Sequence, residues 1–242
     1  MAVSLVTGAA SGIGRATAIR LGRRGDSVVC LDIDGEGAER TAAQIAEAIV
    51  IEANVTDEST MEKAVEETLK TFGDIDCAVA SAGVGGGQDV LMLDLRHFRH
   101  VVEVNLTGSA VTARSVARGL VGRGHGGSIV LLGSISSHIA TASRAAYSAS
   151  KGGVLMLGRA LAVELADHSI RVNVVGPGPI RTPMTDALVS DPLQWETWRR
   201  RIPQARPGEP DEVAAVIEFL TSEEASYVTG AFIPVDGGLL AH

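Results

Sequence analysis

The sequence predicts a single α/β domain with a doubly wound, parallel seven-stranded sheet and helices on both of its faces. Seven short runs rich in β-branched and other apolar residues alternate with helix-length segments in which apolar residues recur at i, i+3 and i+4. The strand-like runs are almost continuously apolar, a pattern typical of parallel strands covered by helices on both sides. Because no linker, short repeat or low-complexity stretch divides the chain, residues 1–242 are expected to form one domain.

Each expected strand is followed by a helical pattern or a turn signal. The strands are 3–7, 27–32, 49–55, 76–80, 128–133, 170–175 and 231–235. A helix is expected to begin at about Arg15, and the clearest helical periodicity covers 60–72 and 145–166. Pro234 lacks the N–H that an interior strand needs, so the last strand is expected at an edge of the sheet.

The composition argues against several classes of protein. A chain of 242 residues, 45% hydrophobic and 21% charged, is long enough to bury a core. Its net charge of −8 disfavours binding to nucleic acid or to an acidic membrane surface, and no apolar run is long enough to span a bilayer. No signal peptide opens the sequence. Cys30 and Cys77 lie in apolar runs, so we expect reduced, buried thiols in a cytoplasmic protein without a metal site.

A glycine-rich turn follows the first expected strand. Gly8, Gly12 and Gly14 allow a tight turn and let backbone N–H groups approach a pyrophosphate at the N-terminus of the next helix. Asp32 ends the second strand, where a carboxylate can bind both adenosine ribose hydroxyls and repel a 2′-phosphate. Glycines alone are a weak signal in a chain with 28 of them, and Asp32 alone could be a solvated turn acid. Together, with no Arg or Lys at 9–14, they favour NAD over NADP.

A tyrosine and a lysine stand four residues apart at the start of the long helix expected at 145–166. The spacing places Tyr147 and Lys151 on one helical face. The ordinary pKa of tyrosine, about 10, is too high for a proton acceptor at neutral pH, and a nearby ammonium favours the phenolate. A chance pair on an exposed face is the plain alternative. It is less expected here because the chain has only two tyrosines, and its only lysines are Lys63, Lys70 and Lys151.

With these motifs, the sequence resembles the short, single-domain branch of the short-chain dehydrogenase/reductase family over nearly its whole length. The joint markers are Gly8, Gly12, Gly14, Ala82, Gly83, Asn105, Ser134, Tyr147, Lys151, Pro177, Gly178 and Thr182. The resemblance implies a Rossmann-like fold, an NAD-dependent oxidoreductase acting on a small-molecule alcohol or ketone, and a homotetramer.

The resemblance also implies roles for individual residues. Tyr147 would be the catalytic acid/base, and Lys151 would lower its pKa and bind the nicotinamide ribose. Ser134 would hydrogen-bond the substrate oxygen, and Asn105, expected in mid-helix, would support a water-linked proton relay from Lys151. The residues assigned to the cofactor are Gly8, Ser11, Gly12, Ile13, Gly14, Asp32, Ile33, Asn54, Val55, Ser81, Ala82, Gly83, Tyr147, Lys151, Pro177, Gly178, Ile180 and Thr182.

Two positions depart from the family pattern. Ser81 stands where the family has the second asparagine of Asn-Asn-Ala-Gly, which puts a ribose contact in doubt. Asn54 replaces the acid that commonly ends the third strand and contacts adenine, although an amide can still donate or accept.

The substrate is left open by the sequence. All eight prolines follow Gly176, and the segment 183–208 is expected to form a substrate lid with a short broken helix. His138 is better explained as a partly exposed loop histidine than as a second acid/base, because Tyr147 already fills that role. Arg144 could meet a substrate carboxylate, but a surface position is the better explanation in a chain with 18 arginines. For Trp195 and Trp198, core packing or a subunit contact is as good an explanation as substrate stacking.

The leading function is oxidation of a secondary alcohol or reduction of its ketone. A reductase of 3-oxoacyl thioesters is the alternative within the enzymes. A non-catalytic nucleotide-binding or scaffold protein is the alternative of another class, because a fold alone does not imply activity.

Overall fold

The computed structural model describes residues 2–241 and contains a seven-stranded sheet in the order β3-β2-β1-β4-β5-β6-β7. Every pair of neighbouring strands is parallel. The strands are β1 (Val3–Thr7), β2 (Ser27–Asp32), β3 (Ala48–Glu52), β4 (Cys77–Ala80), β5 (Gly127–Leu132), β6 (Ile170–Pro177) and β7 (Phe232–Val235). The predicted parallel, Rossmann-like α/β fold is confirmed. β7 lies at an edge, as Pro234 indicates.

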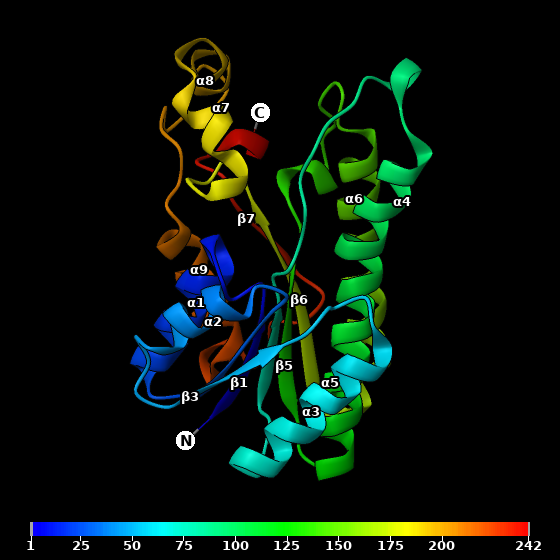
Figure 1. Ribbon diagram of the computed structural model, residues 1–242, viewed down its shortest axis with the longest axis vertical. Coiled ribbons are helices and arrows are strands. Elements are labelled where there is room, and N and C mark those ends of the chain that lie inside the picture. The colour runs from blue at the N-terminus through cyan, green and yellow to red at the C-terminus, as the bar shows by residue number, and fades with distance from the viewer. Residues whose placement is uncertain (1, 242) are drawn as a thin grey trace.

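Helices cover both faces of the sheet (Figure 1). One layer consists of α1 (Gly12–Arg24), α2 (Gly35–Ala42) and α9 (Pro210–Thr221). The opposite layer consists of α3 (Glu58–Phe72), α4 (Leu95–Val102), α5 (Gly108–Arg123) and α6 (Ala145–Glu164). Two short helices, α7 (Asp186–Ser190) and α8 (Pro192–Arg199), lie beyond the sheet near the C-terminus. The short broken helix expected after Pro183 is therefore present.

Alternation along each strand builds two apolar cores. Leu5 and Ile129 belong to the cluster that packs against α3, α5 and α6, whereas their chain neighbours Val6 and Val130 belong to the cluster against α1 and α9. Successive strand side chains point to opposite faces, so a strand covered on both sides needs apolar residues throughout. This explains why polar and apolar residues do not alternate along the strand sequences.

Some element boundaries differ from those expected. The third strand ends at Glu52 and not at residue 55. There the Ala53 N–H still bonds to the Asp32 carbonyl, but the Asn54 side chain accepts hydrogen bonds from Thr56 and turns the chain away. The first helix begins at Gly12, three residues before the expected Arg15, because Ser11 in extended conformation serves as its N-cap residue.

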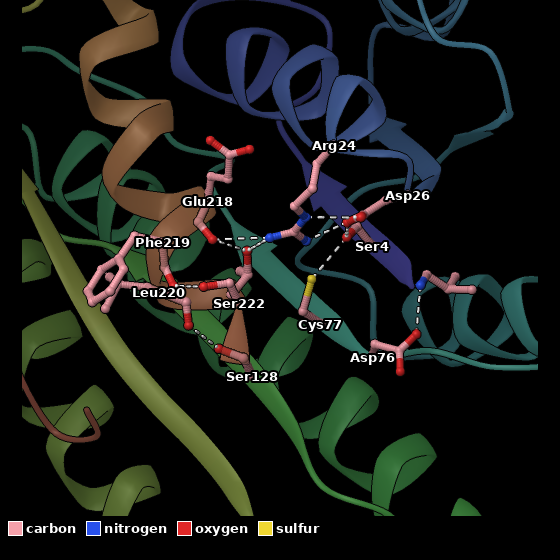
Figure 2. A network of polar contacts seen from close by, with 12 residues as sticks. Ser4, Arg24, Asp26, Asp76, Cys77, Ser128, Glu218, Phe219, Leu220 and Ser222 are labelled. Carbon is pink, nitrogen blue, oxygen red and sulfur yellow. Dashed lines mark hydrogen bonds and ion pairs between the residues drawn. The ribbon is translucent and has the colours of Figure 1, made fainter. Parts of the chain in front are cut away.

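A polar network holds the amino-terminal ends of the strands (Figure 2). Asp26 is buried and accepts hydrogen bonds from Ser4 and Arg24. Arg24 also donates to the Glu218 carbonyl of α9 at 3.1 Å. Ser4 lies 3.0 Å from the sulfur of Cys77, and both Cys77 and Cys30 are buried free thiols. The network joins α1, α9, β1 and β4 at the end of the sheet opposite the glycine turn.

Neither a membrane-spanning helix nor a metal cluster is found within residues 2–241. No helix there combines the length and hydropathy needed to cross a bilayer. No three His, Cys, Asp or Glu side chains in this part of the chain are arranged to hold a metal ion.

Candidate active site

A cavity of about 550 Å³ lies at the carboxyl ends of the strands. Parallel α/β sheets bind ligands at this edge, where the strand order reverses. Here the reversal falls between β1 and β4. With the exception of Asn105, every site residue predicted from the sequence lines this cavity: Gly8, Ser11, Gly12, Ile13, Gly14, Asp32, Ile33, Asn54, Val55, Ser81, Ala82, Gly83, Ser134, Tyr147, Lys151, Pro177, Gly178, Ile180 and Thr182.

The glycine turn is held in close contact with the loop after β4. Gly8 has φ of +71°, and a Cβ there would lie 2.8 Å from the Ala82 nitrogen. A Cβ at Gly14 would clash with the carbonyl of Gly8. The hydroxyl of Thr7 accepts hydrogen bonds from the amides of Ser81 at 3.1 Å and Ala82 at 3.2 Å. On this wall of the cavity, backbone atoms of the glycine turn and of the loop after β4 pack where side chains would otherwise lie.

The N-terminus of α1 has the features of a diphosphate site. Its N-cap residue Ser11 makes no side-chain hydrogen bond to the helix, and no acidic residue stands in the first turn. The first amides of a helix lack intrahelical partners and carry partial positive charge, which favours an anion. No carboxylate of that turn would repel a phosphate, so the residues present fit a dinucleotide.

Asp32 is fixed at the end of β2 by backbone donors. Its two carboxylate oxygens accept from the Ala10 amide at 2.9 Å and the Asp34 amide at 3.0 Å. These bonds orient the carboxylate on the cavity wall beside the glycine turn. Its neighbour Ile33 is 69% exposed, which leaves an apolar surface beside the acid. The arrangement fits the adenosine end of a dinucleotide.

The side chain of Asn54 is engaged locally. Its Oδ1 accepts from the Thr56 amide at 3.1 Å and the Thr56 hydroxyl at 3.0 Å. The Nδ2 group can therefore serve as the donor toward the cavity, which a carboxylate at this position would lack.

Tyr147 and Lys151 meet at the cavity wall formed by α6. Burial raises the pKa of Tyr147, while a hydrogen bond with Ser134 and the positive charge of Arg144 act in the lowering direction. Burial lowers the pKa of Lys151 to about 8. The Lys151 ammonium donates to the Leu132 carbonyl at 2.7 Å and lies 5.8 Å from the centroid of the Tyr147 ring.

Ser134 is positioned by a one-turn 3₁₀ helix, η3 (Ile135–Ser137). Its hydroxyl accepts from the Ser136 amide at 3.1 Å. The Ser137 hydroxyl donates to the Lys151 carbonyl at 2.7 Å, which ties this turn to α6. These hydrogen bonds to the backbone fix Ser134 relative to α6, the helix that carries Tyr147. They have no obvious sequence signal.

Asn105 lies in a π-helical segment, Glu103–Thr107, and not in the regular helix expected from the sequence. Its Oδ1 accepts from the Val84 amide at 2.8 Å, and its Nδ2 donates to the Val84 carbonyl and to Ser150, both at 3.1 Å. Ser150 in turn donates to the Tyr147 carbonyl at 2.7 Å. The side chain therefore connects the loop after β4 to α6, and it is not among the residues that line the cavity.

Sequence reasoning missed part of the cavity wall. His100, Glu103 and Val104 line it from α4 and the π-helical segment. These three positions belong to no recognisable motif, because the tertiary packing of a helix brings them to the cavity. Met184 and Thr185, which belong to the expected lid 183–208, line it as well.

The aromatic residues of the lid and the nearby histidine have structural contacts. Trp195 and Trp198 pack on an apolar cluster that includes Ile202. The His138 ring stands edge-on to Phe232, with centroids 4.4 Å apart. Packing therefore accounts for both tryptophans, and none of these rings lines the cavity.

Known proteins share this sequence and geometry. A family model described as Enoyl-(Acyl carrier protein) reductase matches residues 8–240. Cis-4-hydroxycyclohexanecarboxylate dehydrogenase from Sinomonas cyclohexanicum is 40% identical, covering 99% of this chain and 96% of that protein. A 3-oxoacyl-[acyl-carrier-protein] reductase from Thermotoga maritima is 38% identical, with 98% and 97% covered. A crystal structure of a short-chain type dehydrogenase/reductase from Mycobacterium marinum has a TM-score of 0.94 at 34% identity, with 100% and 96% covered.

The fold, the cavity and the similarity to known proteins together define the class of protein: it is a nicotinamide-dependent oxidoreductase. The chain belongs to the short-chain dehydrogenase/reductase family. The sequence-based expectation of that family is confirmed.

Proposed function

We propose that this protein is an NAD-dependent dehydrogenase that transfers a hydride between nicotinamide and a secondary alcohol or its ketone. The convergence of Ser134, Tyr147 and Lys151 on the cavity that Asp32 also lines carries this proposal. β2, which ends at Asp32, and β5, which precedes Ser134, are three strand positions apart, roughly 14 Å. The cavity therefore offers one region for adenosine and another for chemistry.

In the proposed reaction, Ser134 and Tyr147 hydrogen-bond the substrate oxygen, and Tyr147 takes its proton during oxidation. Nicotinamide, when bound, supplies the hydride acceptor and a positive charge. The Lys151 ammonium, 5.8 Å from the centroid of the tyrosine ring, adds a further positive charge. Burial raises the pKa of Tyr147, and the hydrogen bond with Ser134 and the charge of Arg144 act in the lowering direction. In the proposed reaction the charges of Lys151 and nicotinamide add to these two effects and favour the phenolate. In the reverse direction Tyr147 returns the proton to the ketone oxygen.

Asn105 acts in this proposal as a positioning residue. Through Ser150 and Val84 it holds the start of α6 against the loop that contains Gly83. A Cβ at Gly83 would lie 3.1 Å from the Asn105 Oδ1 and 3.8 Å from the Lys151 Nζ. The water-linked relay expected from the resemblance stays a prediction, and the side-chain amide is committed to this clamp.

The preference for NAD is proposed to come from Asp32. We expect Asp32→Asn to narrow the preference of the enzyme for NAD over NADP by at least about tenfold, because the charge that repels the 2′-phosphate is lost. Steady-state rates with both cofactors and a panel of secondary alcohols measure this. Glu36→Gln, which removes an exposed acid of α2, should leave the preference unchanged. Equal use of NAD and NADP by the unaltered enzyme would contradict the assignment.

Reduction of 3-oxoacyl thioesters is the second candidate. It is favoured by the 38% identity to the reductase from Thermotoga maritima. Turnover of an acetoacetyl thioester faster than of any secondary alcohol or simple ketone would select it. Cofactor binding without turnover of any of these compounds would instead support a non-catalytic protein.

Residues 183–208 are proposed to form the substrate lid, and the protein is proposed to be a homotetramer. Met184, at the start of this segment, would contact a Cβ placed on Gly85 at 3.1 Å, so the segment lies against the loop after β4.

The proposed tetramer is supported by exposed apolar side chains on α6. Met156 and Val163 of α6 are 59% and 80% exposed, which supports an interface on that helix. Light scattering measures the assembly directly.

A further inference from the structure

Arg144 is a cation without a protein partner beside the candidate acid/base. Its guanidinium carbon lies 5.9 Å from the centroid of the Tyr147 ring. Many arginines of the chain pair with carboxylates, as Arg20 does with Glu218. No ion pair among residues 2–241 includes Arg144. An unpaired guanidinium beside the reacting group is therefore free to bind an anion.

The loops around Arg144 hold it in place. Gly87 has no side chain, and a Cβ there would lie 3.6 Å from both the Cδ and the Nε of Arg144. The Gln88 amide donates to the Ser143 carbonyl at 2.8 Å, and Ser143 has φ of +60°. Left-handed backbone at a non-glycine residue is costly and occurs preferentially at functional sites. The contacts bring the arginine against the loop that follows β4.

The placement of Arg144 opposes the local rules of helix stability. It is the N-cap residue of α6 and makes no side-chain capping bond. Arginine is not a favoured N-cap residue, and a cation at a helix N-terminus is disfavoured by the helix dipole. The acids of the neighbouring loop do not compensate it: Asp89 caps the 3₁₀ turn after it, and Asp94 pairs with Arg96. The positive charge is thus left without a carboxylate partner beside the ring of Tyr147, which lines the cavity.

We infer that Arg144 is an anion subsite and that the substrate is a secondary alcohol carrying a carboxylate, or the corresponding oxo acid. The inference rests on the proposed function and names its substrate class. Guanidinium matches a carboxylate with two parallel hydrogen bonds, which are stronger and more directional than bonds to a neutral group. Such a contact would fix the carbinol against Ser134 and Tyr147.

Matched acids and amides test the subsite. 3-Hydroxybutyrate, 4-hydroxypentanoate and 5-hydroxyhexanoate place the carboxylate at increasing distances from a secondary alcohol, and each has a neutral carboxamide of nearly the same shape. We expect one acid to exceed its amide in kcat/KM by about 10- to 100-fold. Arg144→Gln should abolish this ratio, and Arg144→Lys should retain part of it. The ratio cancels any effect of Arg144 on Tyr147, which acts on both compounds alike.

Arg159→Gln is the control, since it removes an exposed arginine of the same helix and should leave the ratio unchanged. Binding of the same acids and amides to the enzyme–NADH complex, in which the alcohol has no hydride acceptor, is measured by calorimetry. This arm separates the two proposals. Turnover with no preference for any acid, or a preference that survives Arg144→Gln, overturns the subsite. Selective acid binding that depends on Arg144 but without turnover supports the subsite and contradicts the proposed function.

Discussion

Lys151 is buried, whereas Lys63 and Lys70 are exposed. Its pKa of about 8 in the folded protein lies below the ordinary 10.5, because burial disfavours the ammonium. The unfolded chain therefore binds this proton more tightly than the folded protein does. The charged lysine destabilises the folded state below pH 8, and this cost disappears as the pH rises toward 10.5. Because Lys151 destabilises the folded state at neutral pH, stability does not explain its presence, which is consistent with a functional role.

Lys151→Met is expected to gain stability relative to the unaltered protein at pH 7 and to lose that gain as the pH rises from 8 to 10.5. Removing the buried charge is worth about 3 kcal/mol, from which about 1 kcal/mol is subtracted for the lost bond to the Leu132 carbonyl. Urea unfolding at several pH values measures the difference. Lys63→Met, on the exposed surface, should show no such pH dependence. A gain that grows with pH would contradict the assignment.

At the scale of single residues, much of the candidate site could be predicted. Residues that follow strand ends directly, such as Asp32 and Ser134, lie where their motifs indicate. Asn105 shows why the rest could not be foreseen. Its π-helical backbone and its clamp on Val84 depend on packing between segments 21 residues apart. Propensity and spacing do not report such contacts.

At the scale of elements, the turn between β1 and α1 depends on the absence of side chains. Gly8 and Gly124 both have left-handed backbone, with φ of +71° and +74°. A Cβ at Gly8 meets the Ala82 backbone, whereas a Cβ at Gly124 meets nothing within 4 Å. The two positions therefore separate backbone strain from steric contact.

Gly8→Ala is expected to destabilise the protein by about 1–3 kcal/mol more than Gly124→Ala, because both pay for left-handed backbone and only the first is overpacked. It should also weaken NAD binding at least tenfold, since displacement of the Ala82 backbone deforms the cavity wall. Denaturant unfolding and cofactor titration measure the two effects. Equal losses for both variants would show that the close approach to Ala82 has no energetic weight.

At the scale of the whole molecule, different kinds of contact stabilise the two ends of the sheet. The carboxyl end is shaped by glycines and backbone contacts, and the amino end by the buried network around Asp26 (Figure 2). Ser128 and Arg171 donate to the Leu220 carbonyl, and Arg24 donates to the Glu218 carbonyl. Carbonyls at the end of a helix lack intrahelical partners, so these bonds fix α9 on the sheet.

Asp26→Ala is expected to cost about 3–5 kcal/mol, because it leaves a partly buried Arg24 without its charge partner. Glu67→Ala, which breaks the exposed pair with Lys70, should cost under about 1 kcal/mol. Thermal and urea unfolding provide both values. Similar costs for the two variants would contradict the role of the network.

The parallel arrangement of the sheet follows from general rules. The number of strands could be predicted from the alternation of apolar runs with helical segments. Apolar strands separated by helical segments favour a parallel sheet with two covered faces. What could not be read from the pattern is the contact of α9 with both β5 and α1, because it joins residues 92 and 198 positions apart. The wall contributed by α4 and the π-helical segment escaped prediction for the same reason.

In the proposed mechanism, Tyr147 exchanges the proton with the substrate oxygen. The most direct measurement compares NADH formation by the unaltered enzyme and by Tyr147→Phe with its best secondary alcohol, alongside NAD affinity. Tyr147→Phe is expected to form NADH about 10²- to 10⁴-fold more slowly, because phenylalanine keeps the ring and loses the acid/base group. NAD affinity should change by less than about threefold, since the cavity wall is preserved. A variant that retains the full rate would contradict the mechanism.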